Sequence, residues 1–185
     1  MSISSDSHAP SATSSASSSP LTEAQKRDRL KDLVGDFDTA MLVTRSQDGG
    51  MHGRPLAIAE KRDDGALYFA TSVESTKVDE IEADPHVTVT MQQGRRFVSL
   101  SGVARVVRDR QLVERLWSEA WKVWFPQGKD DPSLRLLEID PTEASYWDSS
   151  GLQGLKYLFE AAKAYVTGTR PPMGGDETHA AHVKM

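Results

Sequence analysis

Residues 40–71, AMLVTRSQDGGMHGRPLAIAEKRDDGALYFAT, decide the fold. Three short runs rich in apolar, β-branched and aromatic residues are separated by the turn sequences QDGG and RDDG. Connections of this length join neighbouring antiparallel strands, whereas parallel strands need a long crossover between them. The stretch therefore predicts an antiparallel meander with strands over residues 40–44, 51–60 and 66–71.

The flanking sequence adds further strands and peripheral helices. Thr22 and Gln25 have the spacing of a capping box at the start of a helix. An apolar stripe from Leu112 to Trp124 predicts one amphipathic helix after Asp109. Other periodic segments predict helices over 75–83 and 152–166, and strands over 87–91, 97–107 (with a bulge at Gly102), 134–140 and 144–148. Together they predict a mainly β protein with peripheral helices, a six- or seven-stranded antiparallel split β-barrel.

Both ends of the chain differ in composition from its middle. The first 20 residues contain ten serines and two prolines, a composition too polar to offset the entropy of ordering. The last 17 residues contain Pro-Pro and Gly-Gly pairs and little that is apolar. We therefore expect a disordered Ser-rich tail over 1–20, one domain over 21–168 and a flexible tail over 169–185.

Composition also excludes several function classes. The chain has no cysteine, which excludes disulfides, thiol nucleophiles and cysteine-ligated metals. A net charge of −5 argues against nucleic-acid binding, and no apolar stretch is long enough to cross a membrane. With no secretory signal pattern, a cytoplasmic protein is expected. The common nucleotide, zinc-protease and hydrolase motifs are absent, and the histidines are isolated or lie near the ends, so any chemistry would belong to a cofactor.

One segment has the character of an anion site. A strand ends at Thr71, and the chain then enters a helix whose start carries Ser75, Thr76 and Lys77. A helix N-terminus offers unpaired N–H donors and a partial positive charge, to which hydroxyls and an ammonium group add. Arg54 lies on the preceding strand of the meander and brings a guanidinium suited to phosphate.

Pro55 follows that arginine and lacks a backbone donor. Within a sheet, proline is confined to edges, strand starts and bulges. We therefore expect main chain near Pro55 to face a ligand.

A set of motifs in this order resembles the FMN-binding split barrel of the pyridoxamine 5'-phosphate oxidase-like superfamily, and within it the bacterial general stress proteins. The resemblance covers about residues 22–150. The motifs are Arg54-Pro55-Leu56, Tyr68-Phe69-Ala70-Thr71, Ser75-Thr76-Lys77, Asp84-Pro85-His86-Val87, Trp124-Phe125-Pro126-Gln127-Gly128 and Tyr146-Trp147-Asp148.

The resemblance implies a homodimer with FMN, or alternatively FAD, at the interface. Arg54, Lys77 and Thr71, with Ser75 or Thr76, would hold the phosphate. Main chain at Pro55, Leu56 and Ala70 would border the flavin ring. The remaining candidates, some of them from the partner subunit, are Phe69, Met91, Gln92, Phe97 and Trp124.

The resemblance leaves the activity open. The oxidase of the family holds its vitamin substrate with a C-terminal arginine and histidine, whereas here Trp147 is followed by Asp-Ser-Ser-Gly. Oxidation of vitamin B6 is therefore not expected. The chain is interpreted as an FMN-binding stress protein, either a flavin-dependent oxidoreductase with an unknown substrate or a non-enzymatic flavin carrier or sensor. A barrel that binds another cofactor (deazaflavin, FAD or haem) is the remaining alternative.

Overall fold

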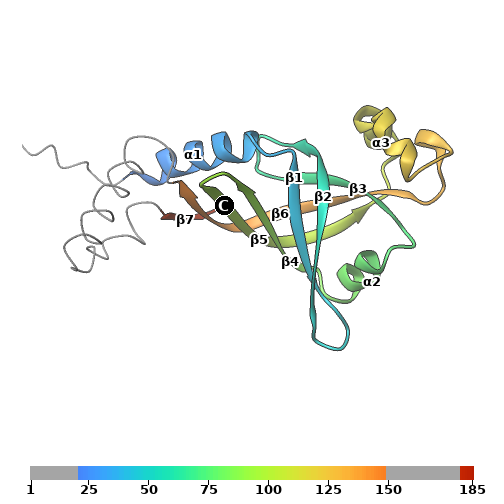
Figure 1. Cartoon of the computed structure of the whole chain (residues 1–185), viewed down its shortest axis with the longest axis horizontal. Coiled ribbons are helices and arrows are strands. Elements are labelled where there is room, and N and C mark those ends of the chain that lie inside the picture. The colour runs from blue at the N-terminus through green and yellow to red at the C-terminus, as the bar shows by residue number, and fades with distance from the viewer. Residues whose placement is uncertain (1–20, 149–179) are drawn as a thin grey trace, which may run out of the picture.

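The computed structural model describes residues 21–148 and 180–185 (Figure 1). The helix expected over 152–166 lies outside these ranges, as does the predicted N-terminal tail. The described elements are α1 (Glu23–Gly35), β1 (Thr39–Arg45), β2 (Met51–Lys61), β3 (Leu67–Ser72), α2 (Thr76–Ala83), β4 (His86–Gln93), β5 (Arg96–Val107), α3 (Arg110–Leu116), η1 (Glu119–Val123), η2 (Gly128–Asp130), β6 (Leu134–Asp148) and β7 (Ala180–Lys184).

The strands form one antiparallel barrel, as the sequence predicts. Their order is β3-β2-β1-β4-β5-β6-β7, and an additional pairing of β3 with β6 closes the first six strands into a ring. The connections from β1 to β2, from β2 to β3 and from β4 to β5 are short turns, and α2 lies between β3 and β4. No helix of the described residues is long and apolar enough to span a membrane.

Strand β6 is 15 residues long because it passes two different neighbours on one edge. Its first half pairs with β3 over Leu134–Ile139, and its second half pairs with β7 over Glu143–Trp147. Two strands, over 134–140 and 144–148, are predicted here from the sequence, but the chain runs through Pro141 as one strand. It is accommodated by an irregularity opposite Gly102, where an added Cβ would lie 2.3 Å from the Asp140 carbonyl oxygen. A bulge was predicted at this glycine; the irregularity does lie beside it, but the extra residue is Thr142 of β6.

Strand β7 lies inside the segment expected to be a flexible tail, so that prediction is wrong for residues 180–184. Val183 of β7 is fully buried and belongs to the main core, paired opposite Ala144. Strand β7 occupies the edge of β6 that β3 has left, and it thereby satisfies backbone groups that would otherwise be open.

The single helix predicted after Asp109 is also wrong. Helix α3 ends at Leu116, Trp117 adopts an extended ψ of 132°, and Ser118 caps the separate 3-10 helix η1. The break lets Trp121 turn under Trp117, with the two rings edge to face at 5.7 Å. The apolar stripe is real, but it folds back on itself and does not continue along one helix.

Two apolar clusters hold the molecule together. The main core fills the barrel between the sheet and α1, whose capping box at Thr22 forms as predicted. A smaller cluster joins α3, η1 and the following loop to the end of the barrel, and it includes Trp121, Phe125 and Tyr68. This second part projects from the barrel as a lobe, at the upper right of Figure 1.

Candidate functional site

The barrel is split where β2 and β3 diverge. Residues 51–57 of β2 pair with β1, and β2 pairs with β3 only from Ile58 onward. The end of β3, Ala70–Ser72, pairs with β6 and not with β2. Within the described ranges, the first half of β2 therefore has one edge without a partner strand.

Pro55 lies on that open edge. The Ile58 N–H donates to the Asp38 carbonyl across the β1 side. Because the backbone N–H and C=O groups of an antiparallel strand alternate in direction, those of residues 57, 55 and 53 point toward the split. Pro55, which has no N–H, therefore lies where no hydrogen bond to β1 is lost, as expected from the sequence.

Helix α2 begins beside this split with an uncapped first turn. The N-cap residue, Ser75, makes no side-chain cap bond to the helix; its Oγ donates to the Ser72 carbonyl at 2.8 Å and lies 3.1 Å from Thr71 Oγ1. In the described part of the chain, nothing accepts a hydrogen bond from the N–H groups of Thr76 and Lys77. Two helix donors and two hydroxyls thus gather at one point, which is how proteins bind small anions.

Lys77 adds an uncompensated charge. Its side chain is half-buried, and it has no hydrogen bond or ion pair with any described residue. Burial lowers the pKa of its ammonium group, the nearby Arg54 charge lowers that pKa further, and Glu80 opposes the shift. A partly desolvated lysine next to an arginine strongly favours an anionic ligand, which would relieve both effects.

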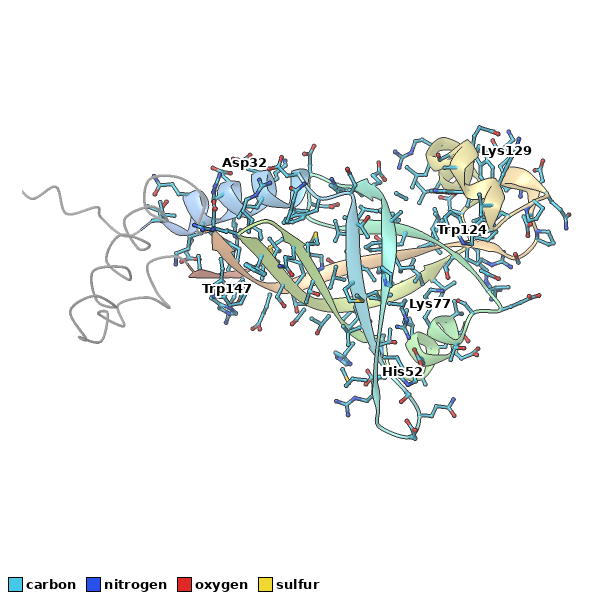
Figure 2. All side chains as sticks on the ribbon, viewed as in Figure 1. Asp32, His52, Lys77, Trp124, Lys129 and Trp147 are labelled. Carbon is cyan, nitrogen blue, oxygen red and sulfur yellow. The ribbon has the colours of Figure 1, made fainter. Side chains whose placement is uncertain are left out.

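Arg54 reaches this region from the inner face of β2. It lies opposite Leu42 of β1, whereas its neighbour Pro55 lies opposite Met41 on the outer face. The Arg54 guanidinium donates from Nη1 to Thr44 Oγ1 and from Nη2 to Glu80 Oε2, the latter at 2.8 Å. Two of its five N–H donors are thus used, and its side chain remains 22% exposed. In Figure 2, Lys77 and His52 mark the same end of the molecule.

A second feature is an open groove of about 800 Å³ on the outer face of the sheet. It crosses β2, β1, β4, β5 and β6, and none of the described residues that line it carries a formal charge. Its lining residues are Thr39, Ala40, Met41, Pro55, Thr90, Met91, Gln92, Phe97, Val98, Ser99 and Trp147.

The predicted site residues divide between these two features. Arg54, Thr71, Ser75, Thr76 and Lys77 gather at the start of α2, with Thr76 on the solvent side. Four others line the groove, namely Pro55, Met91, Gln92 and Phe97, but the Met91 side chain is buried in the main core.

Four predicted residues lie apart from the groove lining. Phe69 is fully buried in the main core, so its side chain supports the split from behind. Leu56 and Ala70 are partly buried, Leu56 against the main core and Ala70 against the lobe's cluster. Trp124 is 70% exposed on the lobe (Figure 2), at the end of the molecule opposite Trp147, so the structure does not bring it to the groove of its own chain.

Sequence reasoning missed a buried polar cluster next to the anion site. The Glu80 carboxylate accepts hydrogen bonds from Thr44 and Arg54 on Oε2, and its Oε1 lies 2.5 Å from His52 Nδ1. Glu80 lies three residues after Lys77, between the apolar residues Val78 and Ile81. An acidic residue on the apolar side of a short helix was the available signal. Trp147 and Met41 of the groove were missed as well.

Comparison with known proteins finds similarity to several general stress proteins. General stress protein 26 of Bacillus subtilis strain 168 is 30% identical over 128 residues, which are 66% of this chain and 89% of that protein. The structure of a Jannaschia sp. CCS1 protein named after general stress protein 26 covers 88% of this chain and 99% of its own, with 25% identity and a TM-score of 0.66. The general stress FMN/FAD binding protein of Xanthomonas citri is 29% identical, over 68% of this chain and 91% of its own, with a TM-score of 0.57.

A sequence model of the family described as "Pyridoxamine 5'-phosphate oxidase like" matches residues 25–172, most of the chain. The match contains the split, the start of α2 and the groove. The chain therefore belongs to the pyridoxamine 5'-phosphate oxidase-like family.

Proposed function

We propose that this protein binds FMN non-covalently, with the flavin phosphate at the start of α2. The observation that carries the proposal is the half-buried Lys77, which has no ion-pair partner among the described residues, beside N–H groups of its own helix for which those residues offer no acceptor. To donate to the phosphate, the hydroxyls of Thr71 and Ser75 would turn away from each other and from the Ser72 carbonyl, and Arg54 supplies a second cation. The relative from Xanthomonas citri is an FMN/FAD binding protein, which agrees with this chemistry.

The uncharged parts of the ligand would lie along the open edge of β2. Main chain at residues 53–57 offers backbone groups there, and Pro55 places an apolar ring beside them. When bound, a flavin supplies electron or hydride transfer. The residues of this chain would bind the phosphate, orient the ring and exclude water from it.

A second copy of the chain completes the proposal. Met41, Phe97 and Trp147 are 40%, 41% and 39% exposed on the outer face of the sheet, around an uncharged groove. Apolar patches of this kind on a sheet are typical of protein interfaces. We propose that the two subunits of a homodimer meet on this face, close to the flavin.

The phosphate site is tested by measuring dissociation constants for FMN and for riboflavin, which lacks the phosphate. Lys77→Ala is expected to weaken FMN about ten- to 150-fold, the equivalent of one charge-assisted hydrogen bond of roughly 1.5–3 kcal/mol. Riboflavin binding should change much less. Lys129→Ala removes a lysine from the distant lobe and serves as the matched control (Figure 2). Equal losses for the two ligands, or an equal effect of the control, would contradict the proposal.

The absorbance spectrum of the purified protein separates a flavin from a deazaflavin or a haem. Addition of NADH or NADPH then tests the activity. Reduction of the bound flavin favours an oxidoreductase, whereas a flavin that stays oxidised with varied donors and acceptors favours a carrier or sensor.

A further inference from the structure

Glu80 is a buried carboxylate at the base of the proposed phosphate site. Its side chain is only 4% exposed, although it lies one turn after Lys77 on a surface helix. A carboxylate in this position would normally face solvent, because burial of an unpaired charge is strongly unfavourable. Its presence inside therefore depends on the groups that surround it.

Those groups divide the two carboxylate oxygens between them. Oε1 faces His52 Nδ1 at 2.5 Å, and Oε2 accepts from Thr44 at 2.5 Å and from Arg54 at 2.8 Å. Thr44 is itself fully buried, and its hydroxyl oxygen accepts from the other terminal nitrogen of Arg54. The three elements β1, β2 and α2 meet at this carboxylate.

The cluster keeps Glu80 ionised. Burial by itself would raise the pKa of the Glu80 carboxyl, but hydrogen bonds from its three partners outweigh this effect and hold that pKa below its ordinary value. A stable negative charge at this point gives the Arg54 guanidinium a fixed direction.

Both terminal nitrogens of Arg54 are held from the inner side. Thr44 fixes one and Glu80 the other, so the plane of the guanidinium is set before any ligand arrives. An arginine side chain that is already ordered loses less conformational entropy when it binds an anion. Because Lys77 and Glu80 belong to one helix, the same contact also ties the lysine to the arginine.

We propose that Glu80 is a positioning residue: together with Thr44 it holds Arg54 so that Arg54 and Lys77 bind the same phosphate group. This rests on the proposed FMN site. Glu80 itself does not touch the ligand; it acts through the arginine, and its negative charge would weaken phosphate binding if it acted alone.

The test uses the preference for phosphate, which is the dissociation constant of riboflavin divided by that of FMN. Glu80→Ala is expected to lower this preference about five- to tenfold, near the upper range of one hydrogen bond. Glu80→Gln should stay within about twofold to threefold of the parent, because its amide oxygen can still accept from both Thr44 and Arg54. In an Arg54→Ala background, Glu80→Ala should not lower the preference, because its target is gone and only its repulsion of the phosphate is removed.

Several results would overturn the proposal. A residue with a purely structural role would weaken FMN and riboflavin by the same factor, and it would do so with or without Arg54. A carboxylate that mainly repels the phosphate would give an increased preference in both Glu80→Ala and Glu80→Gln. If Glu80→Ala fails to fold, Thr44→Val carries the test: the preference should fall about two- to fivefold and not fall in the Arg54→Ala background.

The outcome also separates this proposal from the one on which it rests. If the parent protein does not prefer FMN over riboflavin, the phosphate site is wrong and both proposals fall. If Arg54→Ala lowers the preference and neither Glu80→Ala nor Thr44→Val does, the phosphate site stands and the positioning role of Glu80 is wrong.

Discussion

Val183→Ala tests whether the C-terminal strand is part of the folded barrel. The Val183 side chain is fully buried in the main core, and the substitution removes two of its methyl groups. At about 0.8 kcal/mol for each buried carbon, with a further contribution from the cavity that remains, the loss is about 2 kcal/mol of unfolding free energy. For a chain of this size, that loss lowers the melting temperature by roughly 4–8 °C.

The assay is urea unfolding followed by tryptophan fluorescence, with His182→Ala as the matched control. His182 is the neighbouring residue on the same strand, but its side chain is exposed on the opposite face, where its ring nitrogen lies 3.2 Å from Ser145 Oγ. The control should change stability by no more than about 0.5 kcal/mol. If Val183→Ala is equally neutral, β7 frays in solution and contributes nothing to the barrel. If both variants lose about 2 kcal/mol, the strand matters for a reason other than core packing.

Three other predictions concern function. Because its pKa is lowered, Lys77 should lose its proton below the ordinary lysine pKa of about 10.4, so the preference for FMN should decline as pH rises toward that value. The Lys77→Arg variant should lack this decline in affinity titrations, and a parallel decline in that variant would count against the assignment. Phe97→Asp places a charge on the outer face and should convert a dimer to a monomer in sedimentation at micromolar concentration, whereas a parent protein that is monomeric with flavin bound would refute the dimer. Pyridoxine and pyridoxamine phosphates should not be oxidised above background by the flavin-loaded protein, and measurable turnover would show that the substrate contacts expected to be missing are supplied elsewhere.

The barrel could be predicted because its signals are local. Alternating strands separated by Asp-Gly turns form hairpins whatever lies around them, so β1, β2 and β3 were found close to their observed bounds. The Thr22 cap is also local, since it depends on contacts within the first turn of α1. The close approach at Gly102 is not local, because it is made with Asp140 and Pro141 of β6.

Strand β7 could not be predicted for the opposite reason. Its five residues, AAHVK, contain one large apolar side chain and no useful alternation. It becomes a strand because β3 pairs with β6 only over Leu134–Ile139, which leaves the edge of β6 at Glu143–Trp147 open for β7, and that vacancy is a property of the closed barrel. Similarly, the stripe after Asp109 has helical periodicity throughout, and only its packing against the end of the barrel explains the break at Trp117.

Part of the candidate site could be predicted because β2 carries both a residue of the anion site, Arg54, and a residue of the groove, Pro55. Neighbouring residues of a strand point to opposite faces, so Arg54 reaches the anion site inside while Pro55 lines the groove outside. A sequence pattern identifies both residues but cannot show that the two features lie on opposite sides of one open edge. Nor can it reveal Glu80, whose partners come from β1 and β2, at least 26 residues away along the chain. A ligand with an anionic end and a flat ring would have to pass around the edge of β2 to use both features, which is why main chain at 53–57, and not a side chain, should make its central contacts.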